Sequence, residues 1–135
     1  MRRGLVAANW KMNGQKDEVA RLLENVLSGL EKGGVSDEAC EVLICPPSLY
    51  IDQAREQLKN TTIQLGAQNV YTADKGAYTG EISALMLRDF DCRYTLVGHS
   101  ERRELFAESN SLVTEKFASI QAQSLVPVLC IGESL

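Results

Sequence analysis

Short apolar runs alternate along the chain with segments in which apolar side chains recur every three or four residues. The runs end at polar residues, glycine or proline. The run at 42–45 is continuous and is cut off by Pro46, as expected for a strand that is buried on both faces. We therefore predict five strands, and we expect the first of them to be buried over residues 5–8. The predicted strands cover residues 5–9, 42–45, 63–67, 94–97 and 126–131.

The segments between these runs show the spacing of amphipathic helices. In the first of them, apolar residues recur from Val19 to Leu30, and the pattern stops at Gly33. Ser48 and Ser83 each stand where the N-cap of a helix is expected. We predict four helices, and the apolar positions that mark the second and the fourth are Ile51, Ala54 and Leu58, and Val113, Phe117 and Ile120. The third is predicted to run from Ser83 to about Phe90.

Two segments lack this periodicity and are predicted to be loops, one over residues 68–80 and one that begins at Gly98. Five strands separated by four helices form repeated βαβ units, so we expect a parallel sheet with right-handed crossovers. Residues 1–135 are expected to form a single domain. Two α/β architectures fit this order of elements, a doubly wound open sheet and part of an eight-stranded barrel. The periodicity does not choose between them.

The composition is that of an ordinary folded domain. Of the 135 residues, 44% are hydrophobic and 24% are charged, which argues against disorder. No apolar run reaches the roughly 18 residues of a transmembrane helix, and the run after Arg3 is too short for a signal peptide. We therefore expect a cytoplasmic protein without membrane partners. The net charge of −4 argues against nucleic acid, but one lysine in a focused site can still bind a small anion.

The cysteines and the histidine do not form a metal-binding pattern. Cys40, Cys45, Cys92 and Cys130 show no C-x-x-C spacing, and His99 is the only histidine. A zinc site needs clustered thiolate or imidazole ligands, so we expect no bound metal. Cys45 and Cys130 lie in apolar runs, where a free thiol packs as a small hydrophobic group. Reduced cysteines are therefore favoured over a disulfide framework.

The chemistry of an α/β protein lies at the carboxyl ends of its strands. No G-x-G-x-x-G follows the first predicted strand and no P-loop occurs in the sequence, so dinucleotide binding is poorly supported. Lys11 instead follows the first strand, and His99 follows the fourth. In a closed barrel these two strand ends face each other across the mouth, whereas in an open sheet they lie further apart.

The neighbours of His99 favour a functional role, although an isolated histidine is usually structural. Five polar or charged residues separate it from Leu105. If a helical turn starts here, its amide dipoles oppose a positive charge on the ring. A neutral imidazole can then donate a hydrogen bond to a substrate oxygen on which negative charge builds. From position alone, the structural and the functional interpretations both stay open.

Lys11 follows Asn9 and Trp10 at the end of the first predicted strand. A lysine in such a place is more often a solvated surface charge. Here Trp10 is expected to pack and hold the loop, while Asn9 and Lys11 point toward the mouth. An ammonium group in that position binds an anionic substrate and stabilises an enediolate.

Five loop motifs together closely resemble the triosephosphate isomerase family. They occur in the family's order and cover the whole chain. The motifs are A-N-W-K-M-N-G at 8–14, A-Q-N at 67–69, G-A-Y-T-G-E-I-S at 76–83, V-G-H-S-E-R-R at 97–103 and C-I-G-E at 130–133. The resemblance implies a (β/α)8 TIM barrel, of which this chain carries the first five strands and four helices.

The resemblance also implies an activity and the residues that carry it. The family interconverts dihydroxyacetone phosphate and D-glyceraldehyde 3-phosphate through an enediolate, in glycolysis and gluconeogenesis, without metal or organic cofactor. Asn9 and Lys11 would contact the phosphorylated triose, with Lys11 also catalytic. His99 would be the electrophile that polarises the substrate's oxygens. Glu101 and Ser100 would support this site.

A homodimer is implied in the same way. Thr79 lies on the loop that, in the family, reaches into the active site of the partner subunit. Glu81 and Arg102 match the family's pair that meets across the interface. A polar loop as long as residues 68–80 inside a compact domain is usually functional.

The sequence departs from the family in its length. A barrel of this kind takes about 250 residues, and this sequence stops just after the fifth predicted strand. The family carries its base on a glutamate after strand 6 and binds phosphate with loops after strands 6, 7 and 8. Neither Glu101 nor Glu133 matches that base, so we expect the 135-residue chain by itself to be inactive.

Two other interpretations remain open. The chain can be a non-catalytic fragment that associates with intact subunits through the 68–80 loop. It can also belong to a different phosphosugar barrel enzyme, which the specific motifs make remote.

Overall fold

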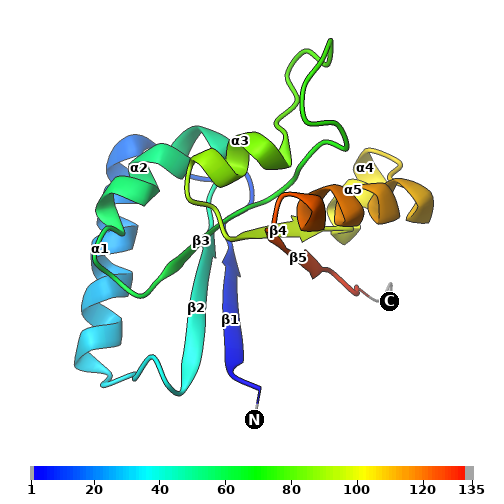
Figure 1. The fold of residues 1–135 in the computed structure, drawn as a ribbon. Coiled ribbons are helices and arrows are strands. Elements are labelled where there is room, and N and C mark those ends of the chain that lie inside the picture. Colours follow the sequence, from blue (N-terminus) through cyan, green and yellow to red (C-terminus); the bar gives the residue numbers. More distant parts are fainter. Residues whose placement is uncertain (1, 133–135) are drawn as a thin grey trace.

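The computed structural model describes residues 2–132, which contain a five-stranded parallel sheet (Figure 1). The strands follow one another in chain order, β1-β2-β3-β4-β5. A doubly wound sheet would reverse its strand order at some point, and this sheet does not. The fold is therefore the N-terminal half of an eight-stranded α/β barrel. The strands are β1 (Gly4–Asn9), β2 (Cys40–Cys45), β3 (Gln64–Ala67), β4 (Tyr94–Val97) and β5 (Val126–Leu129).

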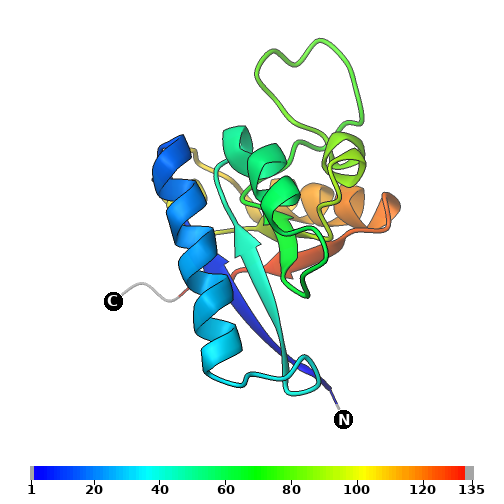
Figure 2. The same ribbon diagram turned by 90° about the vertical axis from the view of Figure 1, so that its left-hand side faces the viewer.

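The helices lie on the outer side of the curved sheet (Figures 1 and 2). Residues 2–132 hold five α-helices and one short 3-10 helix, so the prediction of four helices was wrong. The helix that the sequence did not reveal follows Gly98, where a loop was expected. The helices are α1 (Lys16–Lys32), η1 (Ser48–Tyr50), α2 (Ile51–Gln57), α3 (Ala84–Asp89), α4 (Ser100–Leu105) and α5 (Asn110–Ala122).

The predicted cap at Ser83 is confirmed, whereas the one at Ser48 is wrong. Ser83 Oγ accepts a hydrogen bond from the Met86 backbone N–H at 3.2 Å at the start of α3. Ser48 instead begins η1, and the Tyr50 N–H bonds to the Pro47 carbonyl at 2.9 Å. The physical reason is that this tight 3-10 turn comes first and makes Tyr50 the residue that precedes α2.

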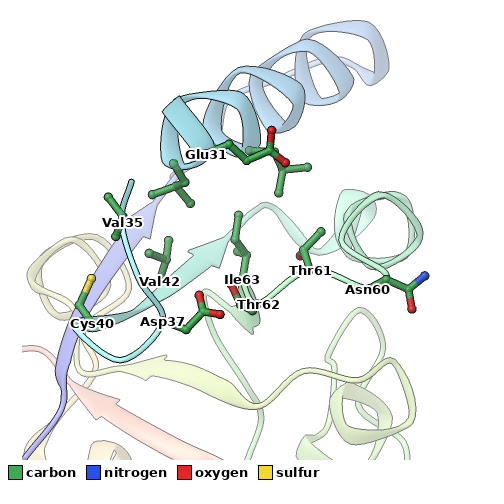
Figure 3. A pocket seen from close by; sticks show the side chains of 11 residues that line it. Glu31, Val35, Asp37, Cys40, Val42, Asn60, Thr61, Thr62 and Ile63 are labelled. Atoms are coloured by element: carbon green, nitrogen blue, oxygen red, sulfur yellow. The ribbon is translucent and has the colours of Figure 1, made fainter. Parts of the chain in front are cut away.

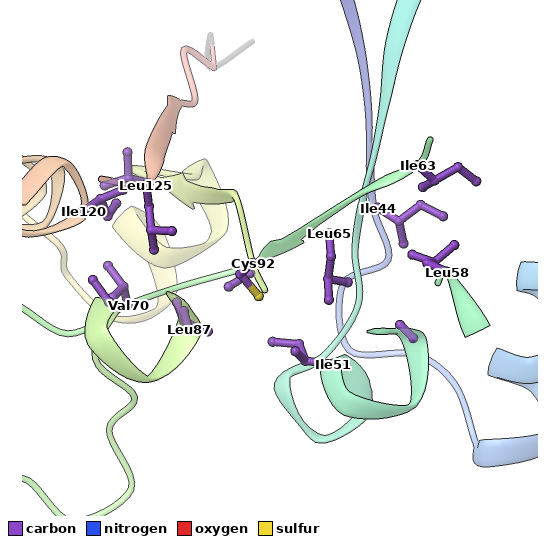
Figure 4. Close-up of a cluster of buried hydrophobic side chains, with 14 of the residues drawn as sticks. Ile44, Ile51, Leu58, Ile63, Leu65, Val70, Leu87, Cys92, Ile120 and Leu125 are labelled. Atoms are coloured by element: carbon purple, nitrogen blue, oxygen red, sulfur yellow. The ribbon is translucent and has the colours of Figure 1, made fainter. Parts of the chain in front are cut away.

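Two hydrophobic clusters hold the half-barrel together, one on each face of the sheet. The outer cluster lies between the strands and the helices and includes the predicted core face of α2 (Figure 4). The inner cluster lies inside the barrel and consists of Leu43, Cys45, Tyr94 and Leu96. Because β2 contributes Ile44 to the outer cluster and its two neighbours to the inner one, β2 is buried on both faces, as predicted.

A glycine on β3 allows the strands to pack closely around the inner cluster. A Cβ atom added at Gly66 would lie 2.9 Å from Cys45 Sγ, 2.9 Å from Leu43 Cδ1 and 3.0 Å from the Tyr94 carbonyl oxygen. These separations are shorter than van der Waals contact. A side chain at this position would therefore force the three inner strands apart.

The expected burial of the first strand was wrong. Residues Gly4–Ala8 of β1 are exposed, with Val6 at 60%. Within residues 2–132, β1 is an outer strand that pairs only with β2. No strand of this described part lies along its other edge, and its apolar side chains stay exposed. An apolar run predicts a strand from its own residues, but its burial depends on neighbours elsewhere in the chain.

All four cysteines are free thiols, and two of them are deep in the core. Cys45 and Cys92 are buried, and burial raises the pKa of each thiol to about 12. Both therefore stay protonated at neutral pH and pack as small hydrophobic groups, as the sequence predicted for Cys45.

Candidate functional site

The parallel register brings the predicted site residues to one edge of the sheet. Asn9 at the end of β1 lies level with Cys45 at the end of β2, and Val97 at the end of β4 lies level with Leu129 on β5. Lys11 and His99 each lie two residues beyond their strands. The two groups that the sequence placed at strand ends therefore lie at the same end of the half-barrel, its mouth, where both approach Glu101.

Lys11 lies in a tight turn that the neighbouring side chains hold. Its φ is +54°, a left-handed conformation that residues other than glycine seldom adopt. Asn9 Oδ1 accepts a hydrogen bond from the Lys11 backbone N–H at 2.9 Å, and Asn13 Nδ2 donates to the Trp10 carbonyl at 2.9 Å. Trp10 packs against the outer cluster, as expected. Asn9 thus shapes the Lys11 turn with its side-chain oxygen.

His99 is the N-cap residue of α4, reached through a sharp turn at Gly98. Gly98 has φ +71°, and a Cβ there would lie 3.1 Å from side-chain atoms of Arg103 and Val113. His99 Nδ1 accepts a hydrogen bond from the backbone N–H of Glu101 at 3.1 Å. Because Nδ1 acts as the acceptor, Nε2 is the ring nitrogen that is left to donate. The sequence analysis considered a helical turn after His99, and α4 forms that turn.

Glu101 lies between the lysine and the histidine. Its Oε1 is 2.6 Å from Lys11 Nζ, and its Oε2 is 3.8 Å from His99 Nδ1. The hydrogen bond from Lys11 lowers the pKa of Glu101 below its ordinary value. A general base works best with a pKa near the working pH, so this carboxylate is suited to hold Lys11 and not to take a proton from carbon. Glu133, the other carboxylate considered, lies outside the described residues.

Together these groups can stabilise negative charge on a bound oxygen. The Nε2–H of a neutral imidazole is a directed donor, and the Lys11 ammonium supplies a positive charge at the same mouth. Donors that are already in place when charge develops lower a barrier more than groups that must first reorganise. The arrangement therefore suits a reaction through an enediolate or another oxyanion.

A separate hollow of about 260 Å³ lies at the opposite end of the strands (Figure 3). It is lined by residues at the end of α1 and at the starts of β2 and β3, among them Glu31, Asp37, Cys40 and Thr62. None of the predicted site residues lines it. Among residues 2–132, no group of three or more histidine, cysteine, aspartate or glutamate side chains could hold a metal ion. No helix in the same range is long and apolar enough to cross a membrane.

A buried ionic cluster supports α4, the helix that His99 caps. Glu108 Oε2 accepts from Arg102 Nε at 2.7 Å and from Lys116 Nζ at 2.8 Å. Lys116 Nζ also donates to Asn69 Oδ1 at 2.8 Å. The side chains of Glu108 and Lys116 are only 3% and 5% exposed. The cluster links α4, α5 and the loop after β3 in one network.

Replacing Lys116 with methionine is expected to lower the free energy of unfolding of the full-length protein by about 3–5 kcal/mol. The reason is that Glu108 would remain charged in the core with one partner fewer, which is the costly way to break a buried ion pair. Denaturant unfolding measures the change. Lys59→Met is the control, because the Lys59–Glu56 pair is solvent-exposed and such pairs contribute little. Equal losses in both variants would contradict the expectation.

The same cluster predicts a pH dependence for that loss. Burial alone raises the pKa of Glu108, but the hydrogen bonds from Lys116 and Arg102 outweigh it, so the pKa lies below its ordinary value. The stabilisation is therefore complete above the pKa of an unfolded glutamate, about 4.3. It is lost as the pH falls through the lower pKa of the folded state. The difference in free energy of unfolding between the wild type and Lys116→Met should therefore shrink in acid.

The predicted interface residues lie on exposed parts of the same end. Thr79 lies on the 68–80 loop, which projects beyond the helices (Figures 1 and 2). Glu81 is also exposed, and Arg102 is half-buried through its bond to Glu108. Ser100 is exposed and is the first residue of α4, directly after His99.

Sequence reasoning missed three residues that shape this site. Gln68 bonds to the Lys11 carbonyl. Glu108 accepts hydrogen bonds from Lys116 and from Arg102 of α4 and so holds that helix. A signal for Gln68 was present, since it directly follows β3 where functional residues gather. Glu108 and Lys116 had no such signal, because charged residues on an amphipathic helix or loop are usually solvated.

Comparisons with known proteins agree with this geometry. The family model for triosephosphate isomerase matches residues 4–135. Triosephosphate isomerases of Legionella pneumophila (strain Lens) and Methylococcus capsulatus are both 52% identical to the whole chain, which covers 53% and 52% of their lengths. The corresponding protein of Dechloromonas aromatica is 50% identical, with 52% of its length covered. The chain thus spans about half the length of the curated relatives it matches. With these motifs, this half-barrel and these matches, the chain belongs to the triosephosphate isomerase family.

Proposed function

We propose that the full-length protein carrying these residues interconverts dihydroxyacetone phosphate and D-glyceraldehyde 3-phosphate through an enediolate. The observation that carries this proposal is the hydrogen bond that the His99 ring accepts from the start of α4. Its Nδ1 accepts the Glu101 N–H at 3.1 Å, which leaves Nε2 free to donate, and the Lys11 ammonium bonds to the side chain of the same Glu101. A donor and a cation that converge on one mouth suit the developing charge of an enediolate.

In this proposal each residue has a separate role. His99 polarises the carbonyl and hydroxyl oxygens of the triose, and Lys11 attracts the anionic substrate and stabilises the enediolate. Asn9 holds the Lys11 turn and lines the substrate site. Glu101 holds Lys11, while Ser100 supports the start of α4. The proton acceptor and the phosphate-binding loops are expected outside this group, so the 135-residue chain alone is proposed to be inactive.

The direct test is an isomerase assay on the full-length protein. Dihydroxyacetone phosphate should be converted to glyceraldehyde 3-phosphate, detected by a coupled dehydrogenase, and the rate should be unchanged after treatment with a chelator. The reason is that the charge-stabilising groups are side chains of the protein itself. No conversion would overturn the proposed function. A rate lost to the chelator and restored by a divalent ion would overturn its metal independence.

We also propose that the protein acts as a homodimer through the 68–80 loop. Residues 74–80 are exposed, and Tyr78, which precedes Thr79, is 46% exposed although it is aromatic. Other large apolar side chains at this end are exposed as well, including Met12 and Leu49. Large apolar side chains exposed at one end of a molecule support an interface there. Glu81 and Arg102 are proposed to meet their counterparts in the partner subunit.

The same surface supports a second candidate function. The half-barrel could serve as a non-catalytic chain that associates with intact subunits through the 68–80 loop. The exposed apolar side chains favour binding, whereas the ion-paired Glu101 argues against catalysis by these residues alone. Sedimentation of the 135-residue chain mixed with the full-length protein tests this second function, and the absence of a complex would overturn it. The four free thiols support a cytoplasmic location.

A further inference from the structure

The side-chain amide of Gln68 donates hydrogen bonds to two backbone carbonyls at the site, and this pair of bonds is called the Gln68 fork. Gln68 directly follows β3, and its Nε2 lies 2.8 Å from the Lys11 carbonyl oxygen and 2.9 Å from the Cys45 carbonyl oxygen. A side-chain NH2 group carries two hydrogens, so one nitrogen can serve both acceptors. Only the NH2 end can bond to two carbonyl oxygens, which defines the orientation of the amide. Gln68 thereby ties the ends of β1, β2 and β3 together.

Lys11 needs such a restraint because its backbone is held in an unfavourable conformation. A φ of +54° at a residue with a side chain persists only where the surroundings over-determine it. Asn9 Oδ1 binds the N–H of Lys11, and Gln68 binds its carbonyl. The Cys45 carbonyl also accepts from the Trp10 N–H at 3.1 Å. Both sides of the Lys11 peptide are thus held against the end of β2.

We propose that Gln68 is a positioning residue for the isomerase reaction, whose amide fork holds the Lys11 turn and so aims the Lys11 ammonium at the substrate. This inference rests on the proposed function. Gln68 acts through the backbone of Lys11. Without the fork, Lys11 can relax toward a negative φ, and its ammonium then moves away from the mouth that it shares with His99.

The kinetic test uses Gln68→Met in the full-length protein, which keeps the length of the side chain but removes both donors. We expect kcat/KM to fall about 10- to 100-fold, the scale of a small misplacement of a reacting group. Gln53→Met is the matched control, because Gln53 Nε2 also donates to a backbone carbonyl, that of Lys16 at 2.8 Å at the start of α1, and this bond involves no site residue. It should stay within about twofold of the wild type. A Gln68→Met protein as active as this control overturns the proposal.

A double-mutant cycle separates positioning from general structural support. If Gln68 acts through Lys11, adding Gln68→Met to Lys11→Ala should cost almost nothing further, since the group it positions is already gone. Losses that multiply overturn the proposal. Gln68→Asn serves if Gln68→Met fails to fold. Asparagine keeps the amide but is one methylene shorter, so it should show the same loss and the same non-additivity.

A third measurement does not depend on activity. The ammonium of Lys11 keeps the pKa of Glu101 below its ordinary value, so a displaced Lys11 should let that pKa rise in Gln68→Met and not in Gln53→Met. A carboxyl NMR titration of the full-length protein reports it directly. An unchanged Glu101 pKa in Gln68→Met overturns the positioning role. If the wild type shows no isomerase activity, the proposed function fails, while this titration still decides whether Gln68 positions Lys11.

Discussion

Replacing His99 with glutamine in the full-length protein is expected to lower kcat for dihydroxyacetone phosphate by about 10²–10³. Loss of one preorganised donor at a developing oxyanion typically has an effect of this size. Glutamine has a different reach from imidazole and lacks the ring nitrogen that accepts the Glu101 N–H at 3.1 Å. Its amide would therefore not be held in the direction in which Nε2–H points.

Lys11→Ala should lower kcat/KM by a similar factor. A larger part of this change should be a rise in KM, because the ammonium also attracts the anionic substrate. Steady-state kinetics on both variants, each with an unchanged thermal melt, measure these effects. Lys16→Ala is the control, since it removes an exposed lysine from the start of α1 nearby. Near-normal turnover in either His99→Gln or Lys11→Ala would show that the assigned roles are wrong.

The 135-residue chain expressed alone is expected to show no isomerase turnover above that of its own His99→Gln variant. The donors for a substrate oxygen lie among its described residues, but Glu101 there is ion-paired with Lys11 at 2.6 Å and has a lowered pKa. Polarising a carbonyl without removing the neighbouring proton leaves the main barrier in place. A coupled assay at high protein concentration checks this, and turnover above the variant would disprove it.

The same chain is expected to self-associate. Its two outer strands, β1 and β5, each carry exposed apolar side chains, such as Val6 at 60% and Leu129 at 48%. Strand edges of this kind invite pairing with other chains. Sedimentation should show species larger than a monomer.

A charged residue on the edge strand should reduce this association. Val6→Lys is expected to shift the chain toward the monomer, because a lysine on an edge disfavours strand pairing. Val35→Lys is the control, as Val35 is 45% exposed but lies between α1 and β2 and off both edges. A sharp cooperative melt at monomeric mass in the unmodified chain would contradict the expectation.

The strands could be predicted from the sequence because each is a short, mostly apolar run that is followed by polar residues, glycine or proline. The residues from Tyr94 to Val97, for example, form β4 with the predicted bounds. The loop motifs that contain His99 and Lys11 likewise indicated the family by themselves. In both cases the information is local, since a strand or a motif is read from adjacent residues.

The errors concern features that depend on capping or on distant segments and not on local apolar periodicity. Helix α4 was not predicted because its sequence, S-E-R-R-E-L, has no apolar periodicity. It forms because Gly98 turns the chain and His99 caps the first N–H groups. The burial of β1 was overestimated because burial depends on segments far from Val6 in the chain. Periodicity reports which face of an element is apolar, and it says nothing of what covers that face.

The sequence by itself determined the fold class and the family, and it singled out Lys11 and His99 as candidate site residues, because strand patterns and loop motifs are properties of neighbouring residues. Only the tertiary structure decided how these groups are held. The Lys11–Glu101 pair joins residues 90 positions apart, and the Gln68 fork reaches 57 positions back to Lys11. The proton on His99 Nε2 likewise follows from a hydrogen bond that exists only once α4 has formed. Hydrogen bonds act over about 3 Å, so their partners become known only when the folded chain brings distant residues together.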